Sequence, residues 1–228
     1  MTSSRLPDET LRTLAKSFAA QARSYGFQTE DYVRFAALLL DQAMSGGDHV
    51  DMPVVEQALP LTGTSLVIRA PADDDRALLG AWLTDPTGRY FLLSRSDGGA
   101  MSVDDLMDGE EHALGVIALR DGTPVGALAY LRGEGGHRKA ELRKIIGVPE
   151  YRGKGLGTEA ARLWVAYGVQ ALGLDKIFLY TLASNLANIH VNEQLGFHVE
   201  GVLQDEVFFD GRAHDVLRMA LVSAEPRD

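Results

Sequence analysis

Three closely spaced glycines flanked by basic residues form the part of this chain best suited to bind a ligand. The stretch reads Arg152-Gly153-Lys154-Gly155-Leu156-Gly157 and stands between a predicted strand and a predicted helix. Glycine permits positive φ angles and lets a ligand approach the backbone closely. Free N–H groups at a helix N-terminus bind phosphate oxygens, and the two cations favour an anion. The turn is therefore a candidate phosphate site, although a plain tight connection between strand and helix would use the same residues.

Two well-known phosphate motifs do not fit this stretch. A P-loop has four residues between its glycines and a Ser or Thr after its lysine, whereas here five residues separate Gly147 from Gly153 and Gly155 follows Lys154. A dinucleotide-binding turn reads G-x-G-x-x-G and has an acidic residue at the end of the next strand. Here the spacing is G-x-G-x-G, and Asp175 precedes its strand. Both motifs are excluded.

Alternating strands and helices from Ser65 onward position this turn. A strand over 140–148 leads into it, and a helix over 157–172 follows it. An Asp-Gly step at 121–122 favours a hairpin. The order of the elements predicts a mixed α/β domain. The remaining predicted strands are 66–69, 113–119, 125–131, 176–182, 197–209 and 214–221, and the remaining predicted helices are 73–83, 102–107 and 185–195.

The beginning of the chain follows a different pattern. Residues 7–27 and 30–44 carry apolar side chains at helical spacing, and Ser45-Gly46-Gly47 ends the second of these helices. The segment is too short to form an independent domain. We therefore predict an N-terminal helical extension over residues 1–60 and a larger α/β domain over residues 61–228.

Composition excludes several classes of function. The chain has 228 residues, a formal net charge of −10 and no cysteine. Disulfides, thiolate metal sites and a cysteine nucleophile are thus excluded, and six histidines without ligand spacing predict no metal site. The acidic balance disfavours a nucleic-acid partner. Met1–Arg5 precede no apolar signal segment, and no apolar run is long enough to cross a membrane, so we expect a soluble, cytoplasmic protein.

Several ordered motifs around the glycine turn resemble those of the GNAT acetyltransferases. Over residues 141–160, which contain Arg-x-x-Gly-x-Gly, the chain is similar to their acetyl-CoA pyrophosphate loop. The resemblance is greatest to the branch of ribosomal-protein N-terminal acetyltransferases and spermidine N-acetyltransferases. It covers about residues 66–222 and implies an α/β (α+β) fold with a mixed central sheet whose strands splay apart. Further similar stretches are 183–188, 192–197, 200–203 and 210–219.

The resemblance implies acetyl-CoA as co-substrate and assigns residues to it. The backbone at the splayed strand would pair with the pantetheine arm, and the N–H groups of the glycine turn would hold the diphosphate. Asn185 matches a position near the pantetheine, whereas Asn188 stands where relatives often have alanine. The implied binding residues are Ile145, Ile146, Gly147, Val148, Arg152, Gly153, Lys154, Gly155, Leu156, Gly157, Thr158, Asn185 and Asn188.

The resemblance also places Glu141 at a position often credited with general-base catalysis. The chemistry is attack by a neutral amine on a thioester. Deprotonating a lysine-like amine of pKa near 10.4 at pH 7 costs about 4.6 kcal/mol, against about 1.4 kcal/mol for an α-amine near pKa 8. A base therefore matters most for a polyamine or a lysine. The alternative is that Glu141 is only a solvated carboxylate at a strand edge.

Asn192 stands where many relatives carry the tyrosine that protonates the departing CoA thiolate. An amide donates hydrogen bonds but does not supply a proton. A thiol pKa near 8.5 nevertheless makes the thiolate a tolerable leaving group near neutral pH. We expect water or another side chain to take over this step, and we rank His190 below bulk water.

The predicted function is direct transfer of an acetyl group from acetyl-CoA to a primary amine. The preferred acceptors are a small amine such as an amino sugar or a polyamine, followed by a protein N-terminus. Because of Asn192, the alternative is a catalytically weak acyl-CoA-binding sensor or interaction module. Residues 1–60 could cap the cleft, form a homodimer interface or bind another protein. Acidic residues at 104, 105, 108, 110 and 111 could attract a cationic amine, although such runs more often form a solvated face.

Overall fold

The computed structural model describes the chain except for residues 1–6, 45–51, 85–101, 110–111, 132–136 and 224–228. The chain separates into two compact units, residues 1–49 and 50–228. This division lies upstream of the boundary that we predicted after residue 60. The difference arises because Met52, Val55 and Leu59 pack against the core of the second unit. The Gln170 side chain also bonds this segment, accepting from the Val55 N–H at 3.2 Å and donating to the Pro53 carbonyl at 2.8 Å.

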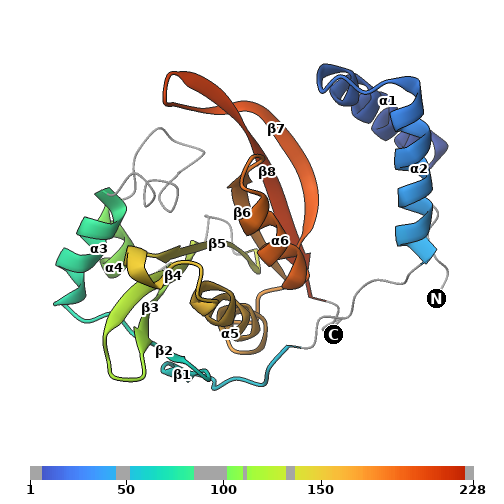
Figure 1. Cartoon of the computed structure of the whole chain (residues 1–228). Helices are drawn as coiled ribbons and strands as arrows, with labels where there is room; N and C mark the ends of the chain where they lie inside the picture. Colours follow the sequence, from blue (N-terminus) through green and yellow to red (C-terminus); the bar gives the residue numbers. More distant parts are fainter. Residues whose placement is uncertain (1–6, 45–51, 85–101, 110–111, 132–136, 224–228) are drawn as a thin grey trace. The chain divides into compact units, whose positions relative to one another are not determined.

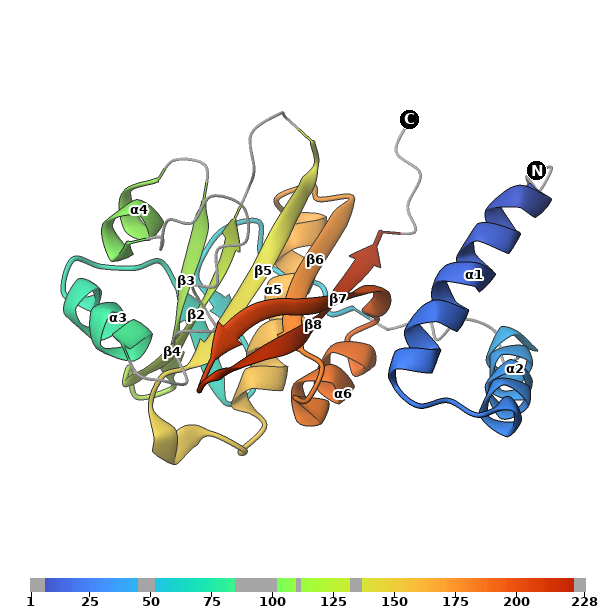
Figure 2. The ribbon, with the colours of Figure 1, turned by 90° about the horizontal axis from the view of Figure 1, so that it is seen from above.

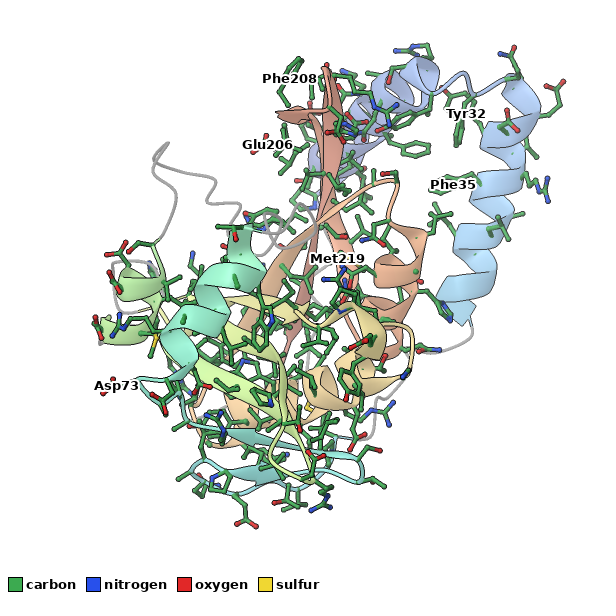
Figure 3. All side chains as sticks on the ribbon, turned by 60° about the vertical axis from the view of Figure 1, so that its left-hand side comes forward. Tyr32, Phe35, Asp73, Glu206, Phe208 and Met219 are labelled. Atoms are coloured by element: carbon green, nitrogen blue, oxygen red, sulfur yellow. The ribbon has the colours of Figure 1, made fainter. Side chains whose placement is uncertain are left out.

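The first unit is a pair of helices, α1 (Asp8–Ser24) and α2 (Thr29–Met44). Aromatic rings form the contact between them: Phe18 on α1 stacks on Phe35 with 4.5 Å between centroids, and Tyr32 and Phe27 meet its edges. Figure 3 shows the Tyr32 and Phe35 side chains on α2. The predicted N-terminal helices are confirmed.

The second unit is built on an eight-stranded sheet in the order β1-β2-β3-β4-β5-β6-β8-β7 (Figure 1). Neighbouring strands are antiparallel except for the parallel pair β5 and β6. The mixed sheet that we predicted is thus confirmed. The strands are β1 (Leu61–Thr62), β2 (Leu66–Arg69), β3 (Ala113–Leu119), β4 (Pro124–Leu131), β5 (Lys139–Ile146), β6 (Lys176–Leu182), β7 (His198–Phe209) and β8 (Arg212–Val222).

Helices cover the two faces of the sheet. On one face α5 (Leu156–Gln170) packs its buried Trp164 against Tyr130 of β4, with 5.4 Å between the ring centroids, and the Tyr130 hydroxyl donates to the Trp164 carbonyl at 2.8 Å. On the other face α3 (Asp75–Thr84) and α4 (Val103–Asp108) bury Trp82 and Leu106 in a second core cluster. Figure 2 shows α3 and α4 together, away from α6 (Leu186–Gln194).

The two parallel strands part after a short paired stretch. β5 and β6 pair at Lys139–Lys176, Ala140–Ile177 and Glu141–Phe178. Beyond that point β5 continues to pair with β4 as far as Ile146, and β6 continues with β8 as far as Leu182. The splay that we predicted is therefore present. No helix within the described ranges is long and apolar enough to span a membrane.

Candidate functional site

A cavity of about 510 Å³ lies where β5 and β6 diverge. It extends along both strands and reaches the glycine turn at Arg152 and Gly153, so it brings together residues that the sequence separates by more than a helix. Six of the predicted binding residues line this one space, namely Ile145, Ile146, Arg152, Gly153, Asn185 and Asn188. Residues that we did not predict also line it, namely Leu142, Arg143, Lys144, Leu179, Tyr180, Thr181, Leu182, Ala187, Val191 and Val216.

The glycine turn presents its backbone at the start of α5. Gly153 and Gly155 have φ angles of 73° and 81°, which other residues adopt only with strain. Within the described ranges, the N–H groups of residues 153–157 donate to no protein acceptor. Lys154 lies beside them, with its ammonium 5.2 Å from the Tyr151 ring centre. Unpaired amides at a helix N-terminus beside a cation fit a diphosphate.

The remaining predicted residues of this turn form the first residues of α5. Leu156 is buried beneath its first residues, and the Thr158 N–H bonds to the Gly155 carbonyl at 3.1 Å. A Cβ built on Gly157 would meet Ile146 at 3.5 Å, an ordinary contact. Leu156, Gly157 and Thr158 therefore anchor the turn against the end of β5.

Arg152 fastens the turn to β5. Its Nε donates to the Ile146 carbonyl at 2.9 Å, and its Nη2 donates to the Gly147 carbonyl at 3.1 Å. The N–H groups of Gly147 and Val148 both donate to the Val125 carbonyl of β4, at 2.9 and 3.2 Å. Strand pairing ends at Ile146, two residues before the predicted end, because the chain turns here into a short 3-10 helix over Pro149–Tyr151.

These contacts bear on the predicted pantetheine site. The backbone of Gly147 and Val148 uses its N–H groups inside the protein, so carbonyl oxygens, each with two lone pairs, are the groups these residues can still offer. Gly147 must also remain glycine for packing, since a Cβ there would lie 2.2 Å from the Trp82 ring. The pantetheine-binding role of Ile145–Val148 stays a prediction.

Two asparagines tie α6 to the cavity wall. Asn185 caps this helix, because its Oδ1 accepts from the Asn188 N–H at 3.2 Å. The Asn188 amide then donates to Thr181 Oγ1 on β6 at 3.0 Å. Asn188, whose role the sequence left open, thus orients α6 against β6.

Glu141 is the last residue of β5 that pairs with β6. Its carboxylate is 14% exposed and forms an ion pair with Arg143 Nε at 2.8 Å. Side chains alternate across a strand, so Glu141, Arg143 and Ile145 share the face that carries α3 and α4. Glu141 does not line the cavity directly. It is half-buried and ion-paired rather than fully solvated, and its catalytic role stays a prediction.

Asn192 is completely buried on α6 and contacts a lysine that the sequence did not single out. Its Oδ1 accepts from Lys144 Nζ at 2.5 Å, and its Nδ2 lies 3.8 Å from the Met219 sulfur of β8, which Figure 3 shows in the interior. Burial lowers the pKa of Lys144 to about 8. The sequence contains one sign that Lys144 is unusual: it interrupts the apolar positions Ala140, Leu142 and Ile146 on one face of the strand.

The acidic run at α4 is largely paired within the protein. Arg76 of α3 forms ion pairs with both Asp104 and Asp108. Asp105 forms a capping box with Ser102, and the Ser102 hydrogen bonds lower the pKa of that carboxyl. The predicted members at 110 and 111 lie outside the described residues. Across the described ranges, no three His, Asp or Glu side chains converge as a metal site.

Comparisons with known proteins agree with this geometry. Residues 65–198 match the family model described as the acetyltransferase (GNAT) domain. The spermidine N(1)-acetyltransferase of Escherichia coli is 33% identical over 152 residues, which span 65% of this chain and 76% of that one. A putative ribosomal N-acetyltransferase of Bacillus subtilis is 30% identical over 107 residues, 47% of this chain and 58% of that one.

Solved structures that resemble this chain also include spermidine N-acetyltransferases. The spermidine N-acetyltransferase of Vibrio cholerae in complex with CoA and spermine superimposes with a TM-score of 0.59 at 26% identity, covering 69% of this chain and 95% of that one. Another structure of the Vibrio cholerae enzyme, described as dodecameric, also gives a TM-score of 0.59 and 26% identity, over 69% of this chain and 94% of that one.

Proposed function

This chain belongs to the GNAT acetyltransferase family and is an N-acetyltransferase acting on amines; from this premise we propose that it transfers the acetyl group of acetyl-CoA to a primary amine of a spermidine-type polyamine. The observation that carries the proposal is the cavity between β5 and β6 that reaches the glycine turn. An elongated thioester with a diphosphate matches a cavity that is lined by two strands and reaches the glycine turn.

The acceptor is supported by the relatives and by charge. Curated relatives that match are spermidine N-acetyltransferases, and one similar structure holds spermine. The net charge of −10 attracts a polycation at a distance. The paired carboxylates of α4 contribute less to this attraction than the sequence suggested, because Arg76 neutralises part of their charge.

The residues of the site have two tasks: they bind acetyl-CoA and they transfer protons. The N–H groups over 153–157 hold the diphosphate, and Asn185 and Asn188 keep α6 against the cavity wall. Glu141, on the face with α3 and α4, accepts the proton that the attacking amine releases. The Arg143 guanidinium holds this carboxylate in place. A polyamine amine is largely protonated at neutral pH, so this proton acceptor contributes most for such substrates.

A panel of amines tests the proposal through release of the CoA thiol. We expect spermidine and spermine to give kcat/KM values well above those of an amino sugar and of a peptide with a free N-terminus. A higher value for the peptide would move the acceptor to a protein N-terminus. Thiol release that no amine stimulates would instead favour the acyl-CoA sensor that Asn192 suggested.

The proposal extends to assembly with further copies of the chain. A related enzyme is described as dodecameric, and apolar side chains of α2 remain more than half exposed, including Leu38, Leu39 and Leu40. Apolar patches of this kind are typical of interaction surfaces. Sedimentation velocity of the purified chain tests this, and a monomer at micromolar concentration would contradict it.

A further inference from the structure

Lys144 is a cationic side chain in the cavity lining to which the proposed function assigns no role. It lies on the splayed part of β5, lines the cavity, and directs its ammonium toward α6, where Asn192 Oδ1 accepts from it at 2.5 Å. Along β5, Lys144 lies between Glu141, where β5 still pairs with β6, and the glycine turn that follows the strand. A thioester whose diphosphate rests on the turn extends along β5 toward this ammonium.

The surroundings of Lys144 favour release of its proton. The other titratable or charged groups of the described lining are Arg143 on the same strand, Arg152 on the turn and Tyr180 on β6. α6 contributes asparagine and apolar side chains, and β8 contributes Val216. Among the described residues, no carboxylate lines the cavity, so burial without a counter-ion lowers the pKa of the lysine to about 8.

We propose that Lys144 is the general acid that protonates the departing CoA thiolate, with Asn192 as the residue that positions its ammonium. This inference rests on the proposed acetyl transfer. It accounts for the asparagine at the place where relatives carry a tyrosine: the proton comes from the neighbouring strand, and the buried amide oxygen orients its donor. The amide can accept this hydrogen bond but has no acidic proton to give.

The step balances in atoms and charge. The amine nitrogen forms a bond to the thioester carbonyl carbon and gives up a proton to Glu141. The carbon–sulfur bond breaks, its electron pair goes to sulfur, and sulfur takes a proton from the Lys144 ammonium. Lys144 is left neutral and Glu141 protonated; Lys144 then takes a proton from water, and Glu141 releases its proton to water. A donor with a pKa near 8 and an acceptor thiol near 8.5 are closely matched, which favours proton transfer.

Substitution of Lys144 by methionine keeps the length of the side chain and removes its proton. We expect kcat with spermidine to fall by roughly 10²-fold or more, as for loss of a general acid, while the affinity for CoA measured by calorimetry stays within a few-fold. Lys139→Met is the matched control, because this exposed lysine at the start of the same strand lies away from the cavity. An unchanged kcat in Lys144→Met would overturn the proposal.

The pH dependence separates proton donation from a packing role. In the wild-type chain kcat should decline as pH rises through about 8, because the donor loses its proton. This decline should be missing in Lys144→Met, whose remaining activity does not depend on the donor. Lys144→Arg keeps the charge and gives up its proton poorly, so we expect it to be slow as well. Full activity of Lys144→Arg would show that charge alone suffices and would contradict proton transfer.

Rescue completes the test. Adding Asn192→Tyr to Lys144→Met places a phenol where relatives have it, and we expect kcat to recover at least tenfold. Folding of each variant is checked by circular dichroism and by retained CoA binding. If the wild-type chain itself transfers no acetyl group, the proposed function fails. If the wild-type chain is active and neither the lost limb of the pH profile nor the rescue is seen, only the role of Lys144 fails.

Discussion

Asp75 illustrates how one buried carboxylate can stabilise the start of a helix beside the site. It is 4% exposed, it accepts from both Nη1 and Nη2 of Arg69 at 2.6 and 2.8 Å, and it accepts the Ala72 N–H at 2.7 Å. The Arg69 hydrogen bonds lower the pKa of this carboxyl. Its stabilising contribution is therefore present above the ordinary pKa of an aspartate and is lost as pH falls through the lowered value.

Asp75→Asn should destabilise the chain by about 2 kcal/mol at pH 7, because it removes a charge-assisted pair and leaves the guanidinium without its acceptor. The difference from the wild-type chain should shrink as pH falls below about 4, where Asp75 of the unfolded wild-type chain binds a proton, and should be lost below the lowered pKa of the folded chain. Denaturant unfolding at several pH values measures both effects. Asp73→Asn, two residues earlier and exposed, should change little, and equal effects of the two substitutions would contradict this assignment.

The charged form of Lys144 should destabilise the folded chain, whereas the charged form of Asp75 stabilises it. Its pKa falls from 10.5 to about 8 on folding, so the unfolded chain binds the proton more tightly between these pH values. The free energy of unfolding of the wild-type chain should rise over that range relative to Lys144→Met, by up to about 3 kcal/mol. Parallel urea unfolding of the two chains between pH 7 and pH 10 measures it. A pH-independent difference would show that the lysine is solvated.

Some residues of the candidate site could be predicted from the sequence and others could not. The glycines of the turn could be predicted, because positive φ and anion binding leave a local pattern. The contact between Lys144 and Asn192 could not, because it joins two residues 48 positions apart and depends on which face of α6 meets β5. The alternation of β5 marks Lys144 as unusual, but only the fold supplies its partner.

The junction of β5 and α5 is where we place the diphosphate of CoA. Gly155→Glu should weaken CoA binding at least 100-fold, since it puts bulk and negative charge at this proposed phosphate position. It also adds strain of about 1–2 kcal/mol at a φ angle of 81°. Gly122→Glu is the control for that strain: Gly122 has a φ angle of 91° in the β3–β4 turn, and a Cβ at either glycine meets nothing within 4 Å. Calorimetry with CoA compares the two, and equal affinities would place the diphosphate elsewhere.

The packing of α5 on the sheet depends on a second glycine. A Cβ on Gly168 would lie 2.4 Å from the Tyr130 hydroxyl, which donates to the Trp164 carbonyl. Gly168→Ala should therefore destabilise the chain by about 1–3 kcal/mol through overpacking. Gly80→Ala in α3 has open space around its Cβ and should stabilise by up to about 1 kcal/mol, because alanine is the better helix former. Thermal unfolding should show shifts of opposite sign, and a neutral Gly168→Ala would contradict the packing.

Elements were predicted well where the pattern is local. The helix predicted over 157–172 is α5 at Leu156–Gln170, and the hairpin at the Asp-Gly step is β3 and β4. The splay followed from the family resemblance and not from hydrophobic pattern, because residues 142–146 look the same whether or not a neighbour pairs with them. The end of β5 was placed two residues late, since the bonds of Gly147 and Val148 to Val125 are long-range.

For the whole molecule, the structure separates compact units at residue 49, whereas we predicted the domain boundary after residue 60. Prolines and the lack of periodicity made residues 48–60 look like the end of the helical extension. In the structure, Val55 and Leu59 contribute to the core of the second unit, and Gln170 of α5 bonds the backbone beside them. A short apolar segment without periodicity gives no sign of the surface on which it packs.

The division at residue 49 leads to a prediction for the whole molecule. Every residue that we place at the cavity, the turn and the proton transfers lies in the unit 50–228. A chain beginning at Val50 should therefore fold, bind CoA with unchanged affinity and retain acetyl transfer to spermidine within a few-fold. A chain beginning at Thr62 should be less stable than one beginning at Val50, because it lacks the segment that packs against the core and pairs Leu61 with Ile68. Calorimetry, thermal unfolding and thiol release compare the two truncations with the full chain. Loss of CoA binding in the chain beginning at Val50 would show that the helical unit completes the site.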